Sequence, residues 1–183
     1  ENFLKLNYNV IGINKNNKIN HKNYIHLKCD LKNKESIENL VKNYNHETYF
    51  FIHNAGIHGP IGKFSKLDFV EWTNAFQVNL FSGVYLLQNL IDNIIKNKGG
   101  CIFIAGGGSA NAMANFTSYS CSKTALVRFI ENISEEYASL RAHCISPGPN
   151  KTKLLDEAKN NGVNVDEKRI VSTDLVFDLC NYL

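Results

Sequence analysis

Hydrophobic residues fall along the chain into short apolar runs that alternate with longer stretches of helical spacing. The short runs predict β-strands over residues 8–13, 24–28, 49–53, 101–105 and 142–145. The longer stretches predict helices over residues 35–44, 68–97 and 119–137, and from residue 173 to the C-terminus. Because the strands alternate with helices, the pattern predicts one α/β domain over residues 1–183 with a doubly wound parallel sheet.

Polar and glycine-rich segments follow the predicted strands where each strand ends. They cover residues 14–15, 30, 54–56, 106–109 and 146–152. In open parallel sheets, ligands bind beyond the carboxyl ends of the strands. The sequence therefore predicts a small-molecule site at this edge of the sheet.

Composition narrows the class of protein. The net charge is only +3 and the lysines are dispersed, so no nucleic-acid partner is expected. No apolar stretch has the length of a membrane span, and the first residues lack a signal-peptide layout. The cysteines are five in number with no C-x-x-C pair, which favours free thiols in a reducing, cytoplasmic compartment. No metal site is expected, because a strand from Tyr24 directs His26 and Cys29 to opposite faces.

Tyr119 and Lys123 are the leading candidates for acid–base chemistry. They stand four residues apart at the start of a predicted helix, on one face. An ammonium about 4 Å from a phenol favours the phenolate and lowers the phenol pKa from its ordinary value near ~10. The alternative is a solvated helix start without chemistry, because Tyr-x-x-x-Lys pairs arise often by chance.

Ordered motifs surround this pair and identify a resemblance. They are His53-Asn54-Ala55-Gly56, Val78-Asn79-Leu80, the glycine run 106–108, Tyr119-x-x-x-Lys123 and Ser146-Pro147-Gly148-Pro149-Asn150-Lys151-Thr152. In this order and spacing the set resembles the short-chain dehydrogenase/reductase family over nearly the whole chain. The resemblance implies a Rossmann-like three-layer sandwich.

The resemblance also implies catalytic roles. Tyr119 is expected to act as general acid or base on a carbonyl or alcohol oxygen. Lys123 is expected to hold the nicotinamide ribose and to lower the pKa of Tyr119. Asn79 is expected to hold a water that relays protons from Lys123 to solvent, although it is alternatively a helix-bend residue.

Further residues are implied as cofactor contacts. The expected set is Asp30, Leu31, Asn54, Ala55, Gly56, Tyr119, Lys123, Pro147, Gly148 and Thr152. Structural alternatives stand beside several of them. Asp30 is alternatively a helix or turn cap, Gly56 a turn residue with positive φ, and Pro147 with Gly148 a strand end.

The choice of nicotinamide cofactor is predicted from Asn14 and Lys15. In the family, an acid at the end of the second strand binds the ribose hydroxyls of NAD, and a basic neighbour favours the extra phosphate of NADP. Here no carboxylate is present, and Lys15 offers a point charge to a phosphate. NADP(H) is therefore expected in preference to NAD(H), unless Lys15 is simply a solvated lysine.

The sequence departs from the family at two places. The glycine-rich strand–turn that cradles the pyrophosphate is not found, and Glu1 to Leu6 resembles the end of the helix that follows it. The usual last strand is also not found, so the sandwich is expected to be truncated at both ends. The position of the family's catalytic serine is occupied by Gly106, and Ser109 is the nearest hydroxyl, either as its replacement or as an ordinary loop serine.

These residues predict an NAD(P)(H)-dependent oxidoreductase that acts on a small carbonyl or alcohol substrate. Two alternatives remain: a non-catalytic or weakly active family member that binds a cofactor or partner, and a sugar-nucleotide epimerase or dehydratase. A homodimer or homotetramer is expected through the two long helices, where Phe81 and Val84 are either contacts or core.

Overall fold

The computed structural model describes residues 1–17 and 19–183, and its elements follow the predicted alternation. In chain order they are α1 (Asn2–Lys5), β1 (Val10–Asn14), β2 (Tyr24–Lys28), α2 (Lys34–Lys42), β3 (Phe50–His53), α3 (Phe69–Phe76), α4 (Ser82–Lys96), β4 (Gly100–Ile104), α5 (Thr117–Glu136), β5 (Arg141–Ile145), α6 (Lys153–Asn160) and α7 (Thr173–Tyr182). A π-turn over Gln77–Phe81 joins α3 to α4, and short 3-10 turns cover Phe64–Lys66 and Glu167–Arg169. The predicted α/β class is confirmed.

All the strand pairs are parallel, but they form two sheets. In one, β1 pairs with β2, with Val10 opposite Tyr24. In the other the order is β3-β4-β5, with Phe50 opposite Gly100 and Gly100 opposite Arg141. Each ladder joins strands that are consecutive along the chain, and among the described residues none joins β1 or β2 to β3. The single sheet predicted from the sequence is therefore divided.

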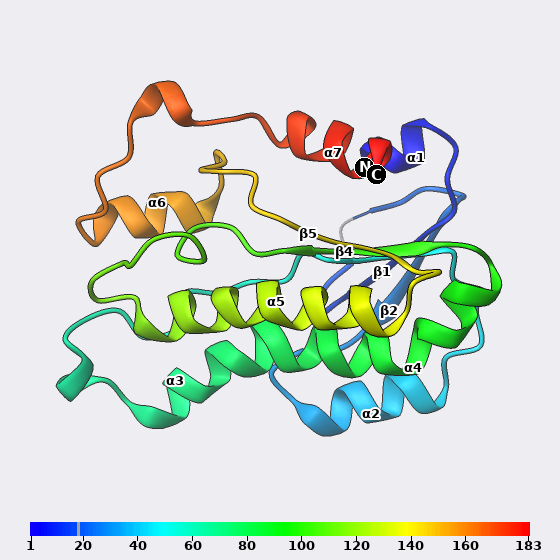
Figure 1. Cartoon of the computed structure of the whole chain (residues 1–183), viewed down its shortest axis with the longest axis horizontal. Coiled ribbons are helices and arrows are strands. Elements are labelled where there is room, and N and C mark those ends of the chain that lie inside the picture. The colour runs from blue at the N-terminus through cyan, green and yellow to red at the C-terminus, as the bar shows by residue number, and fades with distance from the viewer. Residues whose placement is uncertain (18) are drawn as a thin grey trace.

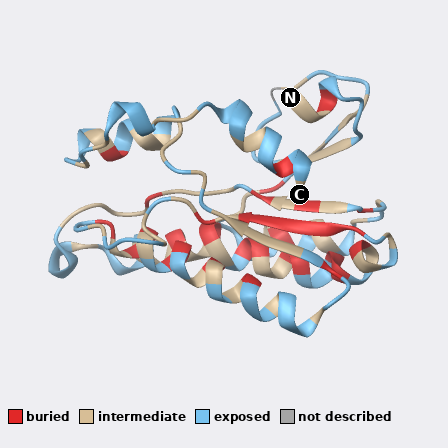
Figure 2. Cartoon of the chain, turned by 45° about the horizontal axis from the view of Figure 1, so that its top comes forward, coloured by how far each residue is buried: buried red, intermediate tan, exposed pale blue. Residues whose placement is uncertain are grey.

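The main hydrophobic core lies between the strands and the helices α2, α4 and α5, which share one side of the sheets (Figure 1). Ile37, Leu87, Ile94, Phe103 and Leu126 are among its buried members. Burial is concentrated in the central strand β4 and in the helix faces turned toward it, whereas α6 and α7 are largely exposed (Figure 2). The ends of the strands are thus held from one side by a well-packed layer.

The long helix predicted over residues 68–97 is interrupted by the π-turn. Asp68 caps its start and accepts a hydrogen bond from the Glu71 N–H at 2.8 Å. Asn79 is fully buried within the π-turn. A π-turn inserts one extra residue into the helical ladder, and such turns are frequent at functional sites. The interruption directs Asn79 toward the loop after β3.

The cysteines are free thiols in the described structure, in agreement with the sequence prediction. Cys101 is fully buried, and burial raises the pKa of its thiol to about 12. Cys121 is exposed on α5. In the part of the chain that the structure describes, no helix has both the length and the apolar character needed to cross a bilayer.

Candidate active site

The carboxyl ends of β3, β4 and β5 lie next to one another because the three strands are parallel neighbours. Residues 54–56, 106–109 and 146–148 therefore share one edge of the sheet. The Ala105 N–H donates to the Ile145 carbonyl at 2.9 Å and extends the ladder to the start of the glycine run. This edge is where the sequence predicted a site.

Tyr119 and Lys123 point from the first turns of α5 into the interior behind this edge. The exposed fraction is 6% for Tyr119 and 3% for Lys123, which rules out a solvated helix start. The Lys123 Nζ donates to the Ile104 carbonyl at 2.8 Å and lies 6.0 Å from the centre of the Tyr119 ring. A buried ammonium and a buried phenol thus stand together at the end of β4.

The protonation of this pair differs from the sequence prediction. Burial lowers the pKa of Lys123 to about 8, because an interior disfavours the charged ammonium. Burial also raises the pKa of Tyr119, for the corresponding reason. The predicted lowering of the Tyr119 pKa by Lys123 is wrong for this arrangement, because the ammonium is directed at the Ile104 carbonyl and burial dominates.

Asn79 fixes the loop that follows β3. Its Oδ1 accepts from the Ile57 N–H at 2.8 Å, and its Nδ2 donates to the Ile57 carbonyl and to the Ser122 Oγ, both at 2.9 Å. Nearby, a Cβ added to Gly56 would lie 3.3 Å from the Lys123 Nζ. Gly56 does not have a positive φ. Its glycine is therefore explained by close approach to Lys123 and not by a turn.

His53 begins the first motif quoted above, but no role at the site was predicted for it. It is buried, and its Nε2 lies 3.0 Å from the main-chain carbonyl of Asn79. Burial is the main cause that lowers the pKa of His53 to about 4, so the ring is neutral at pH 7. A carbonyl only accepts, so Nε2 carries the proton and donates. His53, the last residue of β3, thus stabilises the π-turn through this hydrogen bond.

The Ser109 hydroxyl is engaged by residues other than Tyr119. The Ser109 Oγ donates to the Gly106 carbonyl at 2.8 Å and lies 3.1 Å from the Ser146 Oγ. Gly106 has a φ of +74°, and a Cβ added there would lie 3.5 Å from the Tyr119 Oη. The position next to the phenol is therefore glycine, and a catalytic role for Ser109 stays a prediction.

The predicted cofactor contacts Asn14, Lys15, Asp30 and Leu31 lie at or just beyond the ends of β1 and β2. The Lys15 Nζ forms an ion pair with the Asp30 Oδ2 at 2.7 Å. The hydrogen bond from Lys15 is the main cause that lowers the pKa of Asp30. The Asp30 Oδ1 also accepts from the Lys32 N–H at 3.0 Å, so Asp30 does cap a turn. Asn14 accepts from the Asn16 N–H, and half-buried Leu31 packs against the core.

The segment after β5 leads into α6, a helix that was not predicted. Thr152 is its N-cap and accepts from the Leu155 N–H at 3.4 Å. Gly148 has a φ of +81°, and Pro147 is half-buried at the strand end. His58, in the loop after β3, contacts Glu157 of this helix, with its Nδ1 2.8 Å from the Glu157 Oε2. Their separation of 99 residues leaves no local signal in the sequence.

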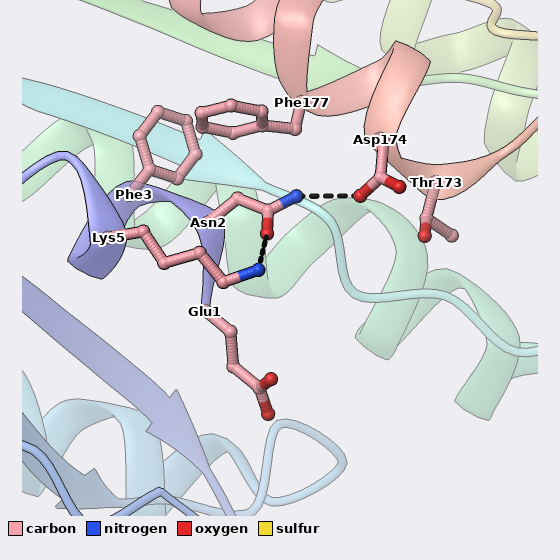
Figure 3. Close-up of a pocket in the computed structure, with 7 residues that line it drawn as sticks. All are labelled: Glu1, Asn2, Phe3, Lys5, Thr173, Asp174 and Phe177. Carbon is pink, nitrogen blue, oxygen red and sulfur yellow. Dashed lines mark hydrogen bonds between the residues drawn. The ribbon is translucent and has the colours of Figure 1, made fainter.

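A separate hollow of about 500 Å³ lies between α1 and α7 (Figure 3). The Asn2 Nδ2 donates to the Asp174 Oδ1 at 2.8 Å across it, and Phe3 packs edge-on against Phe177. None of its lining residues comes from the strand ends, and it is open to solvent. The candidate active site is therefore the edge that holds Tyr119.

Fold and site together define a nucleotide-binding type of α/β domain with a buried tyrosine–lysine pair. A family model described as short chain dehydrogenase matches residues 7–162. The chain belongs to the short-chain dehydrogenase family.

Individual relatives agree with this assignment. The chain is 30% identical over 109 residues to an uncharacterized oxidoreductase of Escherichia coli, a match that covers 58% of this chain and 43% of the relative. It is 30% identical over 152 residues to a 3-oxoacyl-[acyl-carrier-protein] reductase of Buchnera aphidicola, covering 79% and 62%. Among solved structures, ligand-free aldohexose dehydrogenase of Thermoplasma acidophilum superposes with a TM-score of 0.76 and 26% identity, covering 92% of this chain and 67% of the other. The chain thus matches about half of the length of such curated relatives.

Proposed function

We propose that the protein is an NAD(P)(H)-dependent oxidoreductase that transfers hydride between a nicotinamide and a carbonyl or alcohol substrate. The observation that carries the proposal is the joint burial of Tyr119 and Lys123 at the carboxyl end of β4. An interior ammonium destabilises a fold unless it is paired. Its retention beside a phenol, in a member of this family, supports a catalytic site.

Each residue has a proposed task. The cofactor supplies the hydride when bound. Tyr119 gives a proton to the carbonyl oxygen from its Oη or takes one in the reverse direction. Lys123 is protonated at neutral pH, because its pKa is about 8, and offers donors to a ribose. Asn79 and His53 hold the loop and the π-turn around them, and the predicted proton relay through Asn79 remains part of the proposal.

The cofactor contacts are proposed along the same edge. The backbone at Gly56 borders Lys123, Asn54 is exposed at the same strand end, and Lys15 directly follows the last residue of β1. We favour NADP(H) because Lys15 can attract a phosphate. Lys15 already pairs with Asp30, so a bound phosphate has to share or replace that ion pair.

A second candidate is a family member that binds a cofactor or partner without efficient chemistry. Gly106 favours it, because no hydroxyl stands beside the Tyr119 Oη where the family keeps its serine. Loss of a donor to a developing oxyanion typically costs about 2.7–4 kcal/mol in the barrier. Ser109 replaces that donor only if residues 106–109 refold around the substrate.

The test compares Tyr119→Phe with Tyr137→Phe, a control at the C-cap of the same helix. Fluorescence titration with NADPH measures binding, and oxidation of NADPH with a panel of ketones and aldehydes measures turnover. We expect Tyr119→Phe to bind as the wild type does while turnover falls at least ~100-fold, the lower range for acid–base catalysis. Equal turnover in both variants would favour the non-catalytic candidate.

We also propose a homo-oligomer in the cytoplasm. Phe69, Trp72, Phe76 and Phe81 form a continuous aromatic row along α3 and the π-turn, and the exposed fractions of Phe69 and Phe81 are 74% and 50%. Exposed aromatic rows of this kind are typical of interfaces. Light scattering of wild type and Phe81→Glu measures the assembly, and a wild type that is monomeric contradicts it.

A further inference from the structure

His58 occupies a fixed place in the loop that follows β3. Only 4% of it is exposed. Its carbonyl accepts from the Ser118 Oγ at 3.1 Å, which ties the loop to the start of α5. The next residue, Gly59, has a φ of +70°, and a Cβ there would lie 2.7 Å from the same Ser118 Oγ. Backbone constraints on both sides therefore set the direction of the His58 ring.

The ring of His58 packs against the catalytic tyrosine. It meets the Tyr119 ring edge to face, with centres 4.9 Å apart and an angle of 79°. It meets the Phe116 ring in the same way at 5.2 Å and 80°. Edge-to-face pairs prefer a particular geometry beyond simple burial. The orientation of the Tyr119 phenol is thus coupled to the orientation of His58.

The other side of the His58 ring is held by α6. The His58 Nδ1 lies 2.8 Å from the Glu157 Oε2. Ala158, the next residue of α6, is buried in one cluster with Phe116 and Tyr119. Lys159 is occupied by an ion pair with Glu167 and does not compete for Glu157. Through this histidine the helix that covers the tyrosine is connected to the loop beside it.

We propose that His58 and Glu157 are positioning residues, which fasten α6 over Tyr119 and fix the angle of its ring. The inference rests on the proposed catalytic role of Tyr119. Glu157 holds the Nδ1 side of the His58 imidazole, and the contact of the imidazole with the Tyr119 ring fixes the orientation of the phenol.

The experiment uses the full chain and requires neither cofactor nor turnover. Variants Glu157→Ala and His58→Gln are compared with the wild type, and Asp156→Ala is the matched control that removes the neighbouring carboxylate of α6. Hydrogen exchange reports the opening of α6. NMR with ring-labelled tyrosine reports the Tyr119 signal, which is assigned by its loss in Tyr119→Phe.

We expect both pair variants to accelerate amide exchange in α6 by about three- to tenfold, a modest effect because Glu157 is half exposed. The Tyr119 signal should shift in both variants and stay in place in Asp156→Ala. Glu157→Gln keeps an oxygen acceptor for Nδ1 and should restore most of the wild-type signal. This rescue would not be expected if residue 157 acted only through helix propensity.

Two outcomes overturn the proposal. One is an unchanged Tyr119 signal in Glu157→Ala, a surface variant of a helix that should fold whatever its effect on the site. The other is faster exchange that is equal in α2, α4 and α6, which would make the pair a general brace of the fold. A failure of the proposed oxidoreductase activity would leave these readouts unaffected, so the two failures are distinguishable.

Discussion

Two regions at the strand ends are built in opposite ways. The tyrosine region, defined here as Tyr119, Lys123, Asn79 and His53, is buried, and the side chains of Lys123, Asn79 and His53 form hydrogen bonds within the fold. The ribose edge, defined as Asn14, Lys15 and Asp30, is solvent-facing and is held by one ion pair and short turns. In the first region function and stability depend on the same contacts, whereas in the second they are nearly independent.

This difference follows from the free energy of burying polar groups. A buried donor or acceptor must be satisfied, or it costs about 1–3 kcal/mol. Exposed ion pairs contribute about 0–1 kcal/mol. Changes at the ribose edge should therefore alter cofactor choice with little effect on folding, and changes in the tyrosine region should alter both.

The largest expected effect is on Asn79. Asn79→Ala leaves the N–H and carbonyl of Ile57 without their partners in a partly buried setting. We expect the free energy of unfolding to fall by about 4 kcal/mol, and urea denaturation measures it. Asn89→Ala, an exposed amide on α4, is the control and should lose less than about 1 kcal/mol. Equal losses in the two variants would remove the contrast between buried and exposed polar groups.

Replacement of Lys123 should raise the free energy of unfolding, whereas replacement of Asn79 should lower it. Burial lowers the Lys123 pKa from 10.5 to about 8, so at pH 7 both states are protonated and the folded state carries the whole cost of the buried charge. Lys123→Met removes that cost and should raise the free energy of unfolding at pH 7 by about 2 kcal/mol, after allowance for the lost bond to Ile104.

The gain in stability of Lys123→Met over the wild type should decrease as the pH rises. Between pH 8 and 10.5 the unfolded wild type binds the proton more tightly than the folded protein, so wild-type stability rises with pH. The difference in free energy of unfolding between Lys123→Met and the wild type therefore decreases. Urea denaturation at pH 7 and above pH 9 measures this, with the exposed Lys22→Met as control. If this difference in free energy of unfolding were constant across the pH range, the buried ammonium would not be the source of the destabilisation.

The smallest effect on stability is expected at the ribose edge. Lys15→Gln breaks the ion pair with Asp30 and should change the free energy of unfolding by less than about 1 kcal/mol, because both side chains are exposed. The same variant should raise the dissociation constant of NADPH by about three- to tenfold and leave that of NADH unchanged, because only NADPH offers the extra phosphate. Equal dissociation constants of NADPH and NADH in the wild type would contradict the proposed preference.

The sequence predicted those parts of the fold that depend on local patterns. Residues 24–28 form a strand with the predicted bounds, because their apolar run is short and bordered by polar residues. The π-turn was missed, because an insertion into a helix leaves its average periodicity almost unchanged. Helix α6 was missed as well, because only Leu154, Leu155 and Ala158 form its apolar face among charged and amide residues.

The sequence likewise predicted those parts of the candidate site that depend on local spacing along the chain. Tyr119 and Lys123 are four residues apart on one helix, so their proximity follows from helix geometry. The contact between His58 and Glu157 depends on the paths of loops across 99 residues, and no spacing rule reveals it. The direction of the Tyr119 pKa was also beyond the sequence, because it depends on how deeply the phenol is buried.

The π-turn also affects how α3 and α4 are rotated relative to each other about the helix axis. An α-helix advances about 100° per residue, so one inserted residue rotates everything after it by that angle. α3 lies against α5, whereas α4 supplies Leu86, Leu87 and Ile94 to the main core. The wider π-turn absorbs this rotation, so deletion of one residue within Gln77–Phe81 would leave an uninterrupted helix with both faces still aligned but without the widened turn that holds Asn79. The irregularity therefore lets a single long segment keep its two packing surfaces in register while the Asn79 amide is directed inward between them.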